Sequence, residues 1–210
     1  NIMPSSVCTE IFFPSIFMMI PFKTSSKTAT LLPISKRILN LYLISIKIEM
    51  SYFCCKNTKM LKTSSISTKN FFEKATKKVL VTENRKNYLL KIAETIAKEY
   101  TKNGVANLHF ICTHNSRRSQ LANVWSFFAA HHYKLNIIST SGGNEVTCFN
   151  RSTIKTLQKA GFYFQLSDFS HQNPKYEISF DGSKKILVGY SKLIDDASNP
   201  NPFIAITTCS

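Results

Sequence analysis

A cysteine and an arginine separated by five residues, Cys112 and Arg118, are the side chains of this sequence with the clearest potential for chemistry. A cysteine thiolate can attack the central atom of a tetrahedral oxyanion, and the planar guanidinium of arginine can bind two of its oxygens. The intervening residues would surround the same anion with main-chain N–H groups: Thr113, His114, Asn115, Ser116 and Arg117. The spacing therefore predicts an oxyanion site in which Cys112 is the nucleophile.

The residues on either side of this segment predict a strand before it and a helix after it. Leu108, Phe110 and Ile111 form a short apolar run that is typical of a buried strand. After Ser119, apolar residues recur on one face of a helix: Leu121, Val124, Trp125 and Phe128. The segment would therefore end at a helix N-terminus, where free N–H groups and the helix dipole favour a bound anion and the thiolate form of a cysteine.

Two polar side chains fit this arrangement. Asn115 can hydrogen-bond across a tight loop and tolerates the left-handed backbone conformation. Ser119 lies where a hydroxyl group either caps the helix or donates a hydrogen bond to the Cys112 sulfur.

These residues resemble the active-site loop of the low-molecular-weight protein tyrosine phosphatase fold family and, within it, the thioredoxin-coupled arsenate reductases. Four positions match the family loop: Cys112, Asn115, Arg118 and Ser119. His114 departs from it, because many members have glycine there. Residues 203–210 resemble the reductase strand that ends in a second cysteine, here Cys209, and residues 139–143 resemble the small-residue turn after the family's second strand. The resemblance covers residues 82–210.

The resemblance implies one of two cofactor-free and metal-free reactions. In an arsenate reductase, Cys112 would form an adduct with arsenate, and Cys209 would attack the Cys112 sulfur, which releases arsenite and leaves a disulfide for thioredoxin or another thiol donor to reduce. In a phosphomonoester or phosphotyrosine phosphatase, Cys112 would form a phosphocysteine that water hydrolyses. The reductase is the preferred hypothesis, the phosphatase is the alternative, and a noncatalytic oxyanion-binding remnant is the third.

Two parts of the family machinery are expected to lie beyond Ser210, so the chain is expected to be incomplete at its C-terminus. One is a third cysteine, which in the family reductases moves the disulfide to the surface. The other is the aspartate of an Asp-Pro loop, which protonates the leaving group of a phosphatase. Asp195 and Asp196 are the nearest carboxylates before the last predicted strand, and they are considered as substitutes for that acid.

Charge and cysteine spacing limit the other function classes. The net charge of +15 over 210 residues suits anionic substrates, but residues 103–210 carry only +4 of it. No zinc-finger spacing or RNA-binding signature is present, so no nucleic-acid partner is expected. The six cysteines do not have the spacing of a disulfide framework, and a thiolate nucleophile needs reducing surroundings, which favours the cytoplasm.

The sequence divides into three segments. Residues 1–59 begin with Asn1, are expected to be poorly ordered or not part of the native protein, and contain no apolar run of the ~20 residues that span a bilayer. Met50 or Met60 is a candidate start. Residues 60–104 are expected to form a helical extension, with helices over 69–80 and 83–102; Thr82 would cap the second helix and Gly104 would end it.

Residues 105–210 are expected to form the phosphatase-like or reductase-like domain. Strands are expected over 107–111, 135–140, 184–189 and 202–208, and helices over 119–132 and 150–160. This alternation predicts an α/β fold, with a central parallel sheet that has helices on both faces. Cys112 and Cys209 would each follow a strand at its carboxyl end, and therefore lie at the same edge of the sheet, where ligands bind in such folds.

Overall fold

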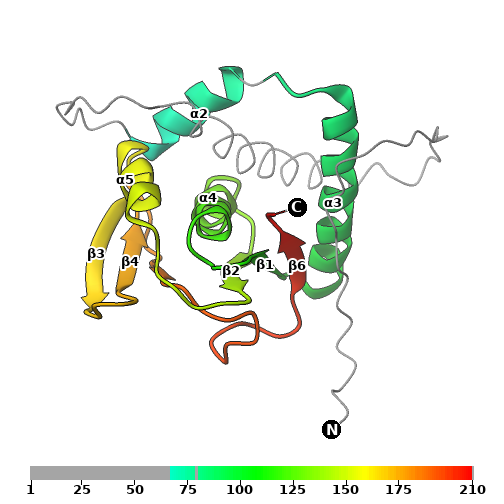
Figure 1. Ribbon diagram of the computed structural model, residues 1–210. Coiled ribbons are helices and arrows are strands. Elements are labelled where there is room, and N and C mark those ends of the chain that lie inside the picture. Colours follow the sequence, from blue (N-terminus) through cyan, green and yellow to red (C-terminus); the bar gives the residue numbers. More distant parts are fainter. Residues whose placement is uncertain (1–66, 79, 210) are drawn as a thin grey trace, which may run out of the picture.

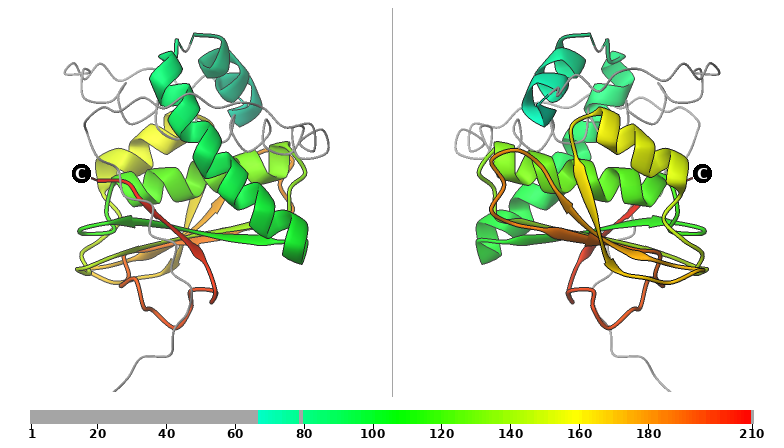
Figure 2. Two further views of the ribbon diagram at one scale, coloured as in Figure 1. Left: turned by 90° about the vertical axis from the view of Figure 1, so that its right-hand side faces the viewer. Right: turned by 90° about the vertical axis from the view of Figure 1, so that its left-hand side faces the viewer.

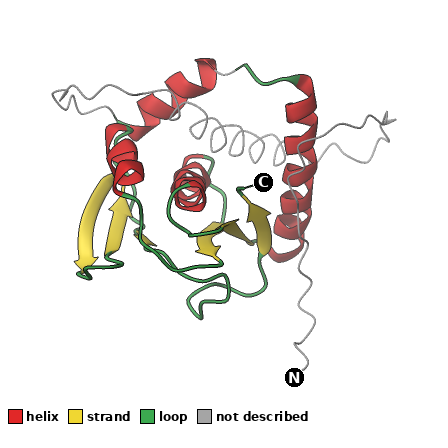
Figure 3. Ribbon diagram, viewed as in Figure 1, coloured by secondary structure: helices red, strands yellow, loops and turns green. Residues whose placement is uncertain are grey.

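The computed structural model describes residues 67–78 and 80–209, and the expectations for residues 1–59 and for Met60 therefore lie outside the described residues. Within the described ranges, no helix has both the length and the apolar character needed to cross a lipid bilayer. Figure 1 labels the elements in chain order, and Figure 3 distinguishes the helices from the strands.

The two helices expected before the first strand are present. They are α2 (Thr68–Lys78) and α3 (Glu83–Asn103). The Thr82 hydroxyl accepts a hydrogen bond from the N–H of Arg85, and Gly104 ends α3 in the left-handed conformation with φ of 69°. Glycine has no Cβ, so it adopts this conformation without strain, and both predicted boundary residues are confirmed.

A three-stranded parallel sheet forms the centre of the molecule. Its strands are β1 (Ala106–Cys112), β2 (Ile137–Gly143) and β6 (Ile204–Thr207), in the order β2-β1-β6. Helix α4 (Arg118–His132) connects β1 to β2 and packs against both strands. The expected α/β class and the expected parallel sheet are therefore confirmed (Figure 1).

A second sheet was not expected from the sequence. Strands β3 (Tyr163–Asp168), β4 (Lys175–Ser179) and β5 (Leu187–Gly189) pair antiparallel after helix α5 (Arg151–Lys159). The prediction that residues 184–189 belong to the parallel sheet is wrong, because β5 pairs with β4. Strand β3 was missed because nearly all of its side chains are exposed, and an exposed strand lacks the apolar alternation that marks a buried one.

The described helices lie on one side of the parallel sheet, which corrects the expectation of helices on both faces. Figure 2 shows these helices above the strands and the segment between β5 and β6 below them. That segment covers the lower face: the Asn107 side chain donates a hydrogen bond to the carbonyl oxygen of Pro202, and the rings of His109 and Phe203 lie 4.7 Å apart. Within the described residues, a loop therefore takes the place of the second helical layer.

The main apolar core lies between the parallel sheet and the helices. Leu108 and Phe110 of β1 are buried in the same cluster as Trp125 and Phe128 of α4. Phe72 of α2 packs against the rings of Trp125 and Phe128, at ring-centroid distances of 6.2 and 5.0 Å. Buried aromatic side chains bury large apolar areas, so this packing holds β1 and α4, and the loop between them, in a fixed relation.

Candidate functional site

The loop between β1 and α4, here called the Cys112 loop (residues 112–118), contains the predicted nucleophile. Cys112 is the last residue of β1 and is 5% exposed. Its Sγ lies 2.9 Å from the Oγ of Ser119, and the Nδ2 of Asn115 donates to the same Oγ at 2.9 Å. Because the amide occupies the hydroxyl as an acceptor, the hydroxyl hydrogen is available to the sulfur, and such a bond stabilises a thiolate.

The structure therefore decides between the two roles considered for Ser119. Helix α4 begins at Arg118, its N-cap residue is Arg117, and no side-chain capping bond is present there. Ser119 is fully buried inside the first turn and contacts the sulfur instead of capping the helix.

Asn115 organises the interior of the loop. It has a φ of 44°, the left-handed conformation that its sequence position suggested, and it is fully buried. Its Oδ1 accepts hydrogen bonds from the Nε2 of Gln120 and from the main-chain N–H of Lys192, both at 3.0 Å. The Asn115 amide therefore both donates and accepts hydrogen bonds, and these bonds connect the loop to α4 and to the segment after β5.

The main-chain carbonyl groups of the loop accept hydrogen bonds from the segments that flank it. The Thr113 oxygen accepts a hydrogen bond from the N–H of Glu145 at 3.0 Å. The His114 oxygen accepts two, from the hydroxyl groups of Thr147 at 3.0 Å and Ser191 at 2.9 Å. These donors come from two segments, one after β2 and one after β5.

The next two carbonyl groups are bound in the same way. The Nε2 of Gln120 donates to the Asn115 oxygen at 3.1 Å, and the N–H of Asn150 donates to the Ser116 oxygen at 3.0 Å. In contrast, no hydrogen bond joins the main-chain N–H groups of residues 113–118 to any other described residue. Successive main-chain N–H groups that have no partner in the protein can bind one anion together, as they do in main-chain nests.

Gly143, the last residue of β2, makes this loop conformation sterically allowed. A Cβ atom at Gly143 would lie 2.7 Å from both the nitrogen of Asn115 and the oxygen of Thr113, and 2.8 Å from the oxygen of Cys112. All three are main-chain atoms, which cannot move aside as a side-chain end can. The prediction of a turn over residues 139–143 is wrong, because these residues belong to β2, but the small residue at the end of that strand is what allows the loop to pack there.

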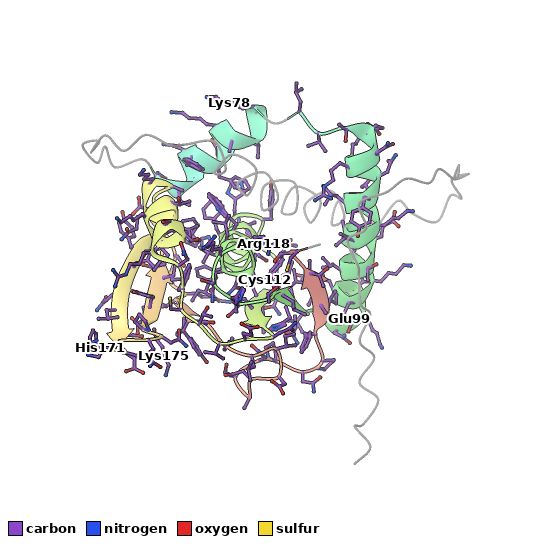
Figure 4. All side chains as sticks on the ribbon, in the orientation of Figure 1. Lys78, Glu99, Cys112, Arg118, His171 and Lys175 are labelled. Carbon is purple, nitrogen blue, oxygen red and sulfur yellow. The ribbon has the colours of Figure 1, made fainter. Side chains whose placement is uncertain are left out.

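The two arginines lie at the start of α4 and are exposed. Figure 4 labels Arg118, the first residue of α4, and Cys112, the last residue of β1. Among the described residues, neither Arg117 nor Arg118 forms an ion pair. Both guanidinium groups are thus available to a bound anion.

The residue before Cys209 is hydrogen-bonded to the residue before Cys112. Strands β6 and β1 are adjacent and parallel, and the N–H and hydroxyl of Thr208 both donate to the carbonyl oxygen of Ile111, at 2.8 and 2.9 Å. Cys112 is the last residue of β1 and Cys209 comes two residues after β6, so both lie at the same edge of the sheet, as their positions in the sequence predicted. Both are free thiols, and Cys209 is partly exposed.

The carboxylates considered as substitute acids lie in the segment after β5. The Asp196 carboxylate accepts hydrogen bonds from the hydroxyl and the N–H of Ser198, and these bonds lower its pKa below the usual value. A general acid needs the opposite shift, because it must hold a proton near neutral pH. Asp195 is exposed. The environment of Asp196 therefore does not suit the role of a general acid.

Sequence reasoning missed Lys192, a buried residue whose main-chain N–H is bonded to Asn115 of the loop. It is 8% exposed, and its Nζ donates to the Ser198 hydroxyl at 2.9 Å and lies 5.4 Å from the centre of the Tyr190 ring. Burial lowers its pKa, although the nearby Asp196 carboxylate opposes that shift. A single lysine in a polar segment gives no sequence signal of this kind.

His109 of β1 was also missed. It is fully buried, its Nδ1 lies 2.7 Å from the Thr140 hydroxyl, and its Nε2 has no hydrogen-bond partner. Burial, and secondarily the charge of Lys192, lowers its pKa to about 4. His109 is therefore neutral at pH 7. Within the described residues, no group of three or more His, Cys, Asp or Glu side chains is placed to hold a metal ion.

Comparison of this chain with protein-family models, with curated proteins and with solved structures gave no significant match.

Proposed function

We propose that the Cys112 loop binds a tetrahedral oxyanion and that Cys112 attacks it in an arsenate reductase-like reaction. The observation that carries this proposal is the arrangement of the loop main chain. Four successive carbonyl groups, from residue 113 to residue 116, are bound by flanking segments, while the N–H groups of residues 113–118 stay available. Together with the exposed Arg118 and the thiol bonded to Ser119, this arrangement supports oxyanion binding and nucleophilic attack.

The first step forms a sulfur–arsenic bond. The Cys112 thiolate donates an electron pair to the As(V) atom of arsenate, and one As–O bond breaks, so that the departing oxygen leaves as water after it takes up a proton. In the second step the Cys209 thiolate attacks the Cys112 sulfur. The S–As bond breaks, its electron pair stays on arsenic, and arsenic leaves as As(III) arsenite while both sulfurs are oxidised to a disulfide.

The disulfide must be reduced before a second turnover. A dithiol protein of the thioredoxin class, or another thiol donor, would supply the two electrons by thiol–disulfide exchange. This requirement supports a reducing compartment such as the cytoplasm as the site of the reaction.

Phosphomonoester hydrolysis is the second candidate, and the Cys112–Ser119 contact favours it. In that reaction the thiolate is the leaving group of the second step, when water attacks the phosphocysteine, and a hydroxyl bound to the sulfur stabilises the thiolate as it forms. The two reactions share the loop and Cys112, and they differ in whether Cys209 is needed.

A single-turnover experiment on the reduced full chain separates these functions. After mixing with arsenate in the absence of external thiol, we expect close to one equivalent of arsenite and a Cys112–Cys209 disulfide, measured by arsenic speciation and peptide mass spectrometry. Cys112→Ala should form neither. Cys209→Ser should release no arsenite but should retain Cys112-dependent turnover of p-nitrophenyl phosphate, if the loop also accepts phosphomonoesters. Cys148→Ser is the matched control, because Cys148 is a free, half-buried thiol beside the loop.

Each other outcome selects a different function. Arsenite release by Cys209→Ser at the wild-type level would remove the redox role of Cys209. Turnover of p-nitrophenyl phosphate without arsenite from the wild-type chain would identify a phosphatase. If arsenate or sulfate raises the melting temperature while Cys112 stays unmodified, the loop only binds the oxyanion.

A further inference from the structure

The rim of the Cys112 loop carries an imidazole and a carboxylate in contact, and the chemistry above does not use them. The Nε2 of His114 lies 3.3 Å from the Oε2 of Glu145, and their side chains are 56% and 61% exposed. His114 follows Cys112 by two residues, and Glu145 follows Gly143, the last residue of β2, by two. Both side chains therefore belong to the same edge of the parallel sheet as the nucleophile.

The main chain fixes this pair with respect to the loop. The N–H of Glu145 donates to the carbonyl oxygen of Thr113 at 3.0 Å. The carbonyl oxygen of His114 is held by the hydroxyl groups of Thr147 and Ser191. The main chain of both residues is therefore anchored to the loop, and their side chains meet above these fixed points.

We propose that His114 is the proton donor to the oxygen that leaves when Cys112 attacks the bound oxyanion, and that Glu145 orients the imidazole. This inference rests on the proposed function. The Nε2 of His114 is paired with the Glu145 carboxylate, which leaves Nδ1 to carry the transferred proton. As the As–O bond breaks, Nδ1–H gives its proton to the departing oxygen, which leaves as water, and the imidazolium becomes a neutral imidazole that solvent reprotonates.

The remaining carboxylates near the loop do not offer an equivalent donor. Asp196 is committed to the hydroxyl and N–H of Ser198, which favour its ionised form. A carboxylate paired with an imidazole is, in contrast, a common arrangement for holding a ring in the orientation that proton transfer requires.

His114→Gln tests the proposal, because glutamine keeps a polar side chain but cannot act as a general acid. We expect the single-turnover rate of arsenite formation to fall roughly 100-fold, within the range typical of general acid catalysis. Alkylation of Cys112 by iodoacetamide should stay within about 2-fold of wild type, since iodide leaves without a proton. Glu145→Gln should slow arsenite formation by about 10-fold, because the ring is still present but is no longer oriented.

His171→Gln is the matched control, since His171 is exposed and lies far from Cys112, beside the antiparallel sheet (Figure 4). Equal slowing of arsenite formation and alkylation by His114→Gln would overturn the proposal and assign His114 to loop structure alone. Unchanged rates in both assays would overturn it as well. A wild-type chain that is alkylated normally but forms neither arsenite nor a disulfide would instead remove the proposed function, and this inference with it.

Discussion

The two sheets of the molecule differ in how deeply their strands are buried and in the loops that follow those strands. Strand β1 of the parallel sheet is mostly buried, and the Cys112 loop follows it directly. Strand β3 of the antiparallel sheet is mostly exposed, with Tyr163 and Leu166 54% and 48% exposed. The parallel sheet thus provides a rigid edge from which several loops meet, whereas the antiparallel sheet is a peripheral layer (Figures 1 and 2).

The antiparallel sheet nevertheless reaches the site through the segment that leaves β5. The carbonyl oxygen of Tyr190 accepts a hydrogen bond from Gln120, the Ser191 hydroxyl binds the His114 carbonyl, and the Lys192 N–H binds Asn115. Residues 190–192 therefore form the outer wall of the loop. One sheet therefore carries Cys112, the proposed nucleophile, and the segment that leaves the other sheet binds the loop around it.

A pair of glycine substitutions should separate these roles most strongly. Gly143→Ala places a methyl group 2.7–2.8 Å from three main-chain atoms of the Cys112 loop, so the loop must move. We expect at least a ~100-fold loss of arsenate affinity, measured by titration calorimetry, because displacements of about 1 Å in a catalytic site have effects of this size.

Gly189→Ala is its counterpart in the antiparallel sheet. The added Cβ would lie 2.7 Å from the Cδ1 of Ile178 and 3.0 Å from the ring of Phe149, and both are side-chain atoms. We expect this variant to lose about 1–3 kcal/mol of stability through overpacking, while its arsenate affinity stays near that of wild type. Similar losses of affinity in both variants would show that the two sheets do not have separate roles.

Asn115→Ala should have the next largest effect, on stability as well as on binding. The substitution leaves the buried N–H of Lys192 without its acceptor and removes the bond to Ser119, and it places alanine at a φ of 44°. Together, an unsatisfied buried group and left-handed strain should cost about 3 kcal/mol of unfolding free energy, measured by urea denaturation. Asn136→Ala, at an exposed position before β2, is the control: it removes one hydrogen bond, from its side chain to the carbonyl oxygen of Gly104, and should cost no more than about 1 kcal/mol.

His109 should make the parallel sheet sensitive to acid. Burial lowers its folded-state pKa from 6.5 to about 4, so the unfolded chain binds the proton more tightly. The free energy of unfolding is therefore highest above pH 6.5, where His109 is neutral in both states. It decreases as the pH falls from 6.5 towards 4, by about 2 kcal/mol at pH 5. Urea denaturation at a series of pH values should show this loss in the wild-type chain, and His109→Asn should reduce it.

The exposed His171 of the antiparallel layer provides the comparison for that experiment. His171→Asn should keep the wild-type dependence on pH. If the wild-type chain and His109→Asn lose stability in parallel between pH 6.5 and 5, His109 does not titrate in the way its burial predicts.

The sequence predicted the parallel sheet well because its strands and their ends carry local signals. The apolar run before Cys112, the helical face after Ser119 and the small residues at 139–143 each lie within a few positions of the feature they indicate. The conformation of the Cys112 loop was beyond such reasoning. Its carbonyl groups are bound by residues remote in sequence, such as Ser191, which is 77 positions from His114. Contacts of this range depend on the tertiary fold, so no local pattern reveals them.

The smallest predicted effect tests whether the antiparallel sheet matters to the loop at all. The side chain of Asn173, in the turn between β3 and β4, donates to the carbonyl oxygen of Ser191 at 2.7 Å and accepts from its N–H at 3.1 Å. Asn173→Ala removes both bonds, and it should cost about 1 kcal/mol of stability and weaken arsenate binding several-fold, because Ser191 holds the His114 carbonyl less firmly.

A double-mutant cycle with Ser191→Ala decides whether Asn173 acts through Ser191. If it does, the loss of arsenate affinity in the double variant should match that of Ser191→Ala alone, because the second substitution removes an interaction that the first has already disabled. Additive losses would mean that Asn173 reaches the loop by another route. No loss of affinity in Asn173→Ala would confine the antiparallel sheet to stability, and the residues after β5 would then hold the Cys112 loop without help from the strands that precede them.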